Sequence, residues 1–142
     1  MRKCSLICLL LFCVLAGKAQ VKKQVLMNVY AANAGLAALD GDEALRKAQL
    51  VTSNGATIEY DLAKKEIRLH IHLPEKHDLF YIDKVEKDSN GNTVYQCTGA
   101  SQQGKVEIVA FQSGDVILAA IDRGVIFMIS NKSKLEMLEG EL

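Results

Sequence analysis

The sequence has no tryptophan and only one proline, Pro74, among its 142 residues. Four tyrosines and four phenylalanines are its other aromatic residues. Sugar-binding proteins commonly stack pyranose rings on exposed tryptophan or tyrosine, so this composition argues against sugar binding. No apolar run reaches the about 20 residues that a transmembrane helix needs. We therefore expect no transmembrane segment once the N-terminal segment is removed.

The N-terminal segment has the order of parts found in secretory leaders. Arg2 and Lys3 precede an uninterrupted apolar run, Leu6–Ala16, and small residues follow within Gly17–Ala19. This order predicts a signal peptide at residues 1–19, cleaved before Gln20, with a retained membrane anchor as the alternative. The sequence therefore predicts an exported protein, located in the periplasm or outside the cell.

The remaining residues, 20–142, have a length that suits a single domain. Cleavage removes Arg2, Lys3 and Lys18 from 17 basic residues that balance 17 acidic ones, so the mature domain is weakly acidic. Without a basic cluster, this charge argues against nucleic acid and anionic lipid as partners. Of the four cysteines, only Cys97 lies outside the leader. It has no internal disulfide partner, and we expect it to be packed as a small hydrophobic residue.

Alternating polar and apolar side chains predict two strands, at residues 57–62 and 66–73. A turn at 63–66 that pairs Tyr60 with Leu69 keeps the apolar residues on one face. The same register sets Glu59 opposite His70.

A second hairpin is predicted between residues 78–87 and 93–98. Val85 and Tyr95 share a face only if the loop between the strands has an odd number of residues. A three-residue loop, Ser89-Asn90-Gly91, meets this requirement with glycine in the left-handed position, whereas a two-residue Asn-Gly turn does not.

The last three predicted strands, 106–112, 116–121 and 125–129, are apolar on both faces, so both faces must be covered. One face belongs to the domain core. The sequence leaves open whether the other is covered by residues 24–50, a second copy in a homodimer, another protein, a membrane component or an apolar ligand. This second face is predicted to carry Val109, Phe111, Val116, Leu118, Ala120, Ile126 and Met128.

Together these patterns predict a mainly β fold, an antiparallel meander of about seven or eight strands that forms a partly open barrel or sandwich. One short helix is expected at Glu43–Leu50, because Asp40-Gly41-Asp42-Glu43 resembles a capping sequence. The polar residues 131–142 are expected to form a frayed tail.

His70 and His72, with His77 beyond Pro74, form the one cluster with metal-ligand character in the sequence. Residues at i and i+2 of a strand point to the same side, and with Glu59 opposite they could bind zinc. The alternative is a solvated strand face with weak His–Glu and Arg–Asp pairs. No Gly-x-Ser-x-Gly elbow, phosphate loop or dinucleotide fingerprint is present. We therefore predict neither an enzyme nor a resident cofactor.

Two segments, residues 56–62 and 82–97, resemble those of small secreted β-meander proteins of Bacteroidota-type bacteria. The resemblance covers about residues 54–130, rests on turn chemistry, and implies a fold and export without an activity. The predicted function is a non-catalytic binding or interaction protein that uses the second apolar face. The alternatives are a carrier with a lipocalin-like cavity for a small apolar ligand and a metal-binding protein.

Overall fold

A computed structural model describes residues 21–33, 45–101 and 104–139. The predicted leader and the predicted cap at Asp40–Glu43 lie outside these residues. Among the residues described, no helix is long and apolar enough to cross a membrane. The described strands are β1 (Val21–Leu26), β2 (Asn28–Asn33), β3 (Gln49–Thr52), β4 (Ala56–Asp61), β5 (Glu66–Ile71), β6 (Lys76–Lys87), β7 (Thr93–Gly99), β8 (Lys105–Ala110), β9 (Val116–Ala120) and β10 (Val125–Ser130).

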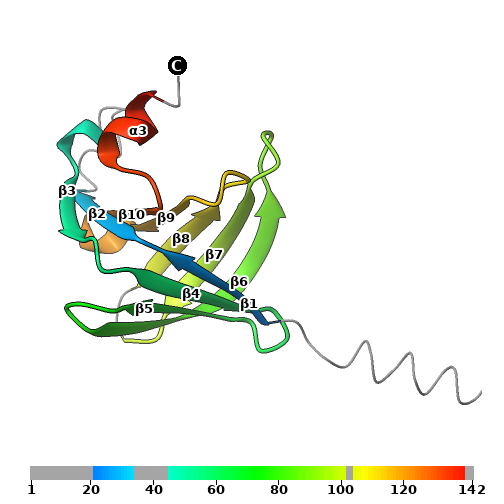
Figure 1. Ribbon diagram of the computed structural model, residues 1–142. Coiled ribbons are helices and arrows are strands. Elements are labelled where there is room, and N and C mark those ends of the chain that lie inside the picture. The colour runs from blue at the N-terminus through cyan, green and yellow to red at the C-terminus, as the bar shows by residue number, and fades with distance from the viewer. Residues whose placement is uncertain (1–20, 34–44, 102–103, 140–142) are drawn as a thin grey trace, which may run out of the picture.

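These strands form one antiparallel sheet whose order from β4 to β10 follows the chain, which confirms the predicted meander. Only Met27 separates β1 from β2, and the two form one bent strand that crosses the molecule (Figure 1). Its first half pairs with β4, and its second half pairs with both β10 and β3. The sheet therefore curls until its two ends meet, as a partly open barrel.

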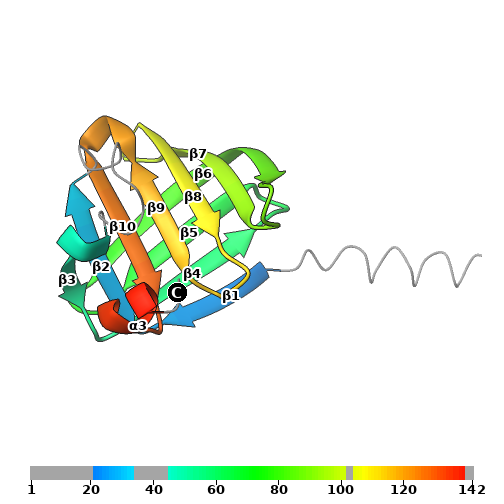
Figure 2. The same ribbon diagram turned by 90° about the horizontal axis from the view of Figure 1, so that it is seen from above.

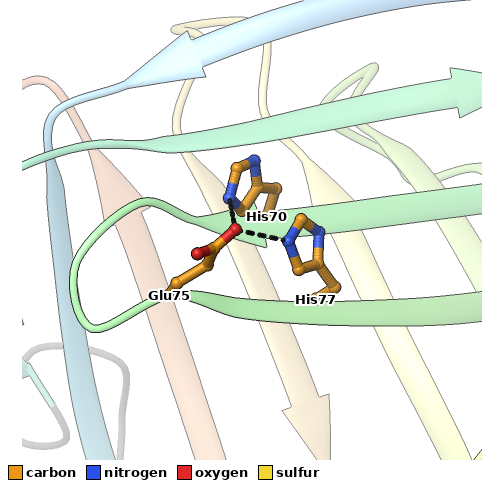
Figure 3. Close-up of side chains that lie close together, drawn as sticks. All are labelled: His70, Glu75 and His77. Carbon is orange, nitrogen blue, oxygen red and sulfur yellow. Dashed lines mark hydrogen bonds and ion pairs between the residues drawn. The ribbon is translucent and has the colours of Figure 1, made fainter.

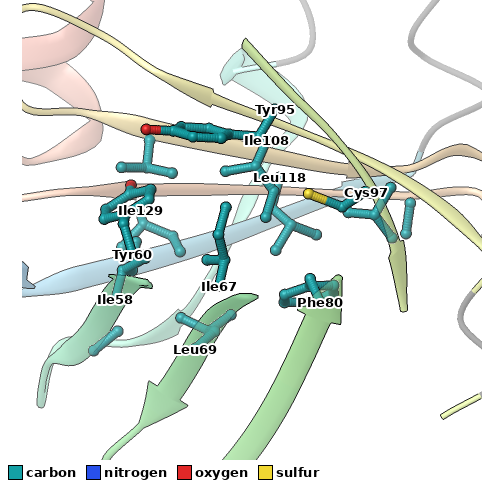
Figure 4. Close-up of a cluster of buried hydrophobic side chains, with 14 of the residues drawn as sticks. Ile58, Tyr60, Ile67, Leu69, Phe80, Tyr95, Cys97, Ile108, Leu118 and Ile129 are labelled. Atoms are coloured by element: carbon teal, nitrogen blue, oxygen red, sulfur yellow. The ribbon is translucent and has the colours of Figure 1, made fainter. Parts of the chain in front are cut away.

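The sheet curls into two layers, in which strands β8–β10 lie over β4–β6 and run across them (Figure 2). Alternate residues of each strand point between these layers and form the main core. Phe80, Ile67 and Ile108 are among its fully buried side chains. The core also contains Cys97, and the rings of Tyr60 and Tyr95 lie 5.3 Å apart between their centroids (Figure 4).

The predicted pairing of β4 with β5 is wrong by two residues, although the faces are right. Tyr60 pairs with Ile67, and Glu59 pairs with Arg68. The turn keeps its four residues but lies one residue earlier than expected, at 62–65, because Asp61 accepts a 3.0 Å hydrogen bond from the backbone N–H of Lys64, which closes a local turn before β5 begins.

The predicted three-residue loop between β6 and β7 is confirmed. The Asp88 backbone N–H donates to the Asn92 carbonyl at 3.0 Å, and Gly91 has the left-handed φ of 81° that such a loop requires. Val85 pairs with Tyr95 as expected. A bulge between Ile82 and Lys84 then shifts the register toward the start of β6.

The prediction that the last three strands are apolar on both faces is confirmed, but β9 was assigned the wrong way round. Ala110 pairs with Val116, and Ile108 pairs with Leu118, so these residues share the core face. Val116 and Leu118 therefore belong to the main core and not to the predicted interaction surface. Ile117 faces outward in their place and packs on a second cluster.

This second cluster covers part of the outer face of β9, β10 and β2. Met128 and Tyr30 contribute from the sheet, Leu45 from the short helical turn at 45–47, and Ala48 from the residue between this turn and β3. The helix α3 (Lys134–Glu139) adds Met137 and Leu138. Its first residue, Lys134, donates hydrogen bonds to the carbonyls of Arg46 and Ala48. The expectation of a frayed tail is therefore wrong for residues 134–139.

Met128→Asp is expected to lower the free energy of unfolding by at least about 2 kcal/mol, the lower end for the loss of a buried large side chain. Met128 is 7% exposed in the second cluster, whereas Leu135 of α3 is 65% exposed. Leu135→Asp is the matched control and should change stability little. Chemical denaturation of both variants measures the free energy of unfolding. Equal losses in the two variants would contradict the packing of the second cluster on the outer face of the sheet.

Candidate functional site

The hairpin of β5 and β6 presents different chemistry on its two faces. His70 pairs with His77, and on either side of this pair Leu69 faces Asp78 and Ile71 faces Lys76. Because neighbouring residues of a strand point to opposite faces, the histidines lie on the outer face, and the other pairs point toward the inside of the sheet. One hairpin thus contributes to two candidate sites.

The inner face borders a cavity of about 210 Å³ at one end of the main core. Its wall is mostly apolar and comes from β5, β6, β8, β9 and β10, together with the 3-10 turn η2 (Ile121–Arg123). The lining residues are Leu69, Ile71, Lys76, Asp78, Phe80, Val106, Leu118, Ala120, Arg123, Val125 and Phe127.

Three charged side chains border this cavity. The ammonium of Lys76 lies 3.4 Å from a carboxylate oxygen of Asp78, whose side chain is only 9% exposed. The same ammonium lies 5.9 Å from the centre of the Phe127 ring. The guanidinium of Arg123 forms no ion pair with the described residues. The cavity therefore combines an apolar wall with an excess of positive charge.

Beyond the cavity the core is closely packed. Ile58, Ile67, Ile108 and Ile129 surround a space that is too small for a water molecule. A bound molecule therefore has to stay at the mouth of the curled sheet and cannot run through it.

Cys97 is part of this packed region, as the sequence predicted. Its side chain is 1% exposed. Burial raises the pKa of the Cys97 thiol to about 12, and the nearby Asp83 carboxylate adds to the rise. Because the thiolate is the reactive form, Cys97 is unsuited to nucleophilic or metal-binding chemistry.

On the outer face, His70, Glu75 and His77 come together (Figure 3). One carboxylate oxygen of Glu75 lies 3.1 Å from Nε2 of His77 and 3.7 Å from Nε2 of His70. The two imidazole rings are stacked with their centroids 4.0 Å apart. The hydrogen bond from His77, the charge of His77 and then that of His70 lower the pKa of the Glu75 carboxyl.

Two residues of the predicted metal-binding set, Glu59 and His72, have other partners in the structure. Glu59 lies opposite Arg68 and not opposite His70, as a consequence of the two-residue shift in register. The His72 ring touches that of His70 edge-on at 4.9 Å between centroids, but its Nε2 lies 2.8 Å from the hydroxyl of Thr57. The sequence interpretation missed Glu75, which follows directly after Pro74, and placed His77 beside the other two histidines without counting it among the ligands.

The predicted interaction surface is divided between several environments. Val116 and Leu118 lie in the main core, and Met128 lies in the second cluster. Val109, Phe111 and Ile126 are half-buried on or beside the outer face. Phe111 and Met128 line a groove of about 460 Å³ that Leu45 and Met137 also border.

Comparison with known protein families, with curated proteins and with solved structures finds no match to this chain. The geometry of the two sites therefore has to carry the functional argument.

In the native protein, Cys97 should resist alkylation by iodoacetamide at about pH 8, because little thiolate forms at a thiol with a strongly raised pKa. The same reagent should label Cys97 fully once the chain is unfolded in denaturant. Mass spectrometry of the peptide that contains Cys97 measures both states. Rapid labelling without denaturant would contradict the buried placement.

Proposed function

We propose that this chain is an exported binding protein that holds a small amphiphilic molecule in the cavity of its curled sheet. The observation that carries the proposal is an apolar cavity whose charged groups include one more cation than anion. Ligand pockets typically combine a mostly apolar wall with a few polar groups that orient the ligand. The signal peptide predicted at residues 1–19 supports the proposed location outside the cytoplasm.

The size of the cavity limits the ligand. Its volume is about 210 Å³, below the roughly 300–1,000 Å³ that holds drug-sized ligands. A group the size of one water molecule takes about 30 Å³ in the liquid, so about seven such groups fit. A short hydrocarbon chain of about seven carbons meets this limit, whereas a sterol or a long acyl chain does not.

The charged residues at the cavity select the head group. Lys76 is already paired with Asp78 at 3.4 Å. Arg123, which is exposed on η2, can therefore supply a planar, permanently charged partner for a carboxylate. A medium-chain monocarboxylate is the ligand class that fits, because its hydrocarbon chain packs against the apolar wall and its carboxylate reaches Arg123 at the mouth of the cavity.

The cavity is preferred to the outer apolar face as the functional surface. The 45–47 turn and α3 pack against part of that face, with Met137 and Leu138 in the second cluster. An interaction through the whole predicted face would require these segments to leave. The cavity needs no such rearrangement, because its lining is in place.

Octanoate is expected to bind with one molecule per chain in isothermal titration calorimetry, because its seven-carbon tail fills the cavity. Octylamine, with a similar tail and the opposite charge, and acetate, with the same head group and almost no tail, should bind more weakly. Arg123→Gln should weaken octanoate binding about two- to fivefold, the size expected for an exposed ion pair.

Arg68→Gln is the matched control, because Arg68 is also exposed but lies away from the cavity, paired with Glu66. This variant should bind octanoate as the unmodified protein does. The absence of octanoate binding, or equal affinity for octylamine, would refute the proposed ligand class.

A further inference from the structure

We propose that His70, Glu75 and His77 bind a divalent first-row transition metal ion, with Zn²⁺ as the best-fitting ion. One ligand atom from each of these residues lies within 4.8 Å of the other two. The site is on the outer face of the β5–β6 hairpin and is independent of the proposed cavity ligand.

The separations between the ligand atoms suit zinc coordination. Bonds of about 2.1 Å at tetrahedral angles place two zinc ligands about 3.4 Å apart. The Glu75 oxygen lies 3.1 Å from Nε2 of His77 and 3.7 Å from Nε2 of His70, on either side of that value. An ion of this size can therefore be reached from all three residues with small side-chain movements.

The scaffold holds the two histidines in place. His70 and His77 are directly opposite each other in the β5–β6 ladder, and Glu75 lies in the turn that joins these strands. Such cross-strand neighbours have Cβ atoms about 5 Å apart, which brings both rings to one point. Binding requires the stacked rings to rotate until their nitrogens converge. The rotation meets little resistance, because the side chains of His70 and His77 are 38% and 65% exposed.

The donor set decides which ions fit. Two imidazole nitrogens and one carboxylate oxygen suit zinc and neighbouring transition metals, whereas magnesium and calcium prefer oxygen ligands alone. The chain has only three histidines, and all of them lie on this hairpin or directly after β5. The third, His72, bonds to Thr57 and borders the site without joining it.

Three protein ligands leave the fourth position of a tetrahedral zinc ion open. Beside His70 and His77 lies a groove of about 320 Å³, whose other lining residues include Glu59 and Arg68. The open position therefore has room for water or an external ligand. This arrangement differs from a closed structural zinc site, in which protein side chains supply all four ligands.

The test is a zinc titration of the chain expressed with its own N-terminal segment and without a polyhistidine tag. Cys4→Ser, Cys8→Ser and Cys13→Ser remove the thiols of that segment as competing ligands. Calorimetry should show one Zn²⁺ per chain, and the melting temperature should rise with zinc concentration by mass action. Magnesium at the same concentrations should produce neither effect.

Two variants remove one ligand each, His77→Gln and Glu75→Gln. Each should lower the zinc affinity at least about tenfold, since even outer-shell partners of a metal change affinity by about 10–100-fold. Both side chains are exposed, at 65% and 70%, so the variants should fold, which circular dichroism verifies.

His72→Gln is the matched control, because it removes a neighbouring imidazole that is not among the three ligands. It should keep the affinity and the shift in melting temperature. The proposal is overturned if zinc does not bind, if binding survives both ligand variants unchanged, or if His72→Gln weakens binding as much as His77→Gln does.

Discussion

Two facing bends, at Met27 and Gly55, hold the two ends of the sheet together. The Met27 carbonyl accepts a hydrogen bond from the Gly55 backbone N–H at 3.0 Å. The Met27 N–H donates to the side-chain oxygen of Asn131, also at 3.0 Å, directly after β10 ends. Gly55 has a backbone φ of 99°, which residues other than glycine adopt only with strain. The backbone groups at the bend are therefore satisfied by residues next to β4 and to β10, the strands that β1 and β2 join.

Both candidate sites depend on this closure. An open sheet would expose the apolar inner face of β4–β10, and its unpaired edges would invite association. When the sheet is curled, Leu69 and Ile71 of β5 face Leu118 and Phe127 across the cavity. The outer face of the same hairpin is left in solvent, where His70 and His77 are accessible. The curl thus separates a mostly apolar cavity, open at the mouth of the sheet, from an exposed polar site on the outer face.

The alternation of polar and apolar residues predicts faces well, but it does not determine register. Ile58, Tyr60, Ile67 and Leu69 all point inward as expected, because a shift of two residues leaves every face unchanged. The turn after Asp61 set the actual register, and that shift removed Glu59 from the histidine cluster. A shift of one residue does change the faces. The expected loop between β8 and β9 differs from the observed one by one residue, and this exchanged the faces of Val116 and Ile117.

Features that require distant segments to meet were beyond prediction from pattern alone. The cavity depends on how far β5 and β6 lie from β9 and β10 across the curled sheet, and no local sequence motif encodes that separation. Similarly, α3 is too short to show an amphipathic period, and its packing depends on Lys134 reaching the carbonyls of the 45–48 segment. Glu75 was missed because its position beside His70 arises only when the turn folds back.

Amide hydrogen exchange across Val21–Asn33 tests the closure of the sheet most directly. If β1 and β2 form one strand that pairs with β4 and with β10 and β3, the amides that bond to these neighbouring strands should exchange slowly in both halves, alternate residues in β1 and most residues in β2. The Met27 amide should also be protected, through its bond to Asn131. Fast exchange throughout Val21–Leu26 and at Met27, with protection confined to β5–β8, would show that the sheet is open and would contradict the account.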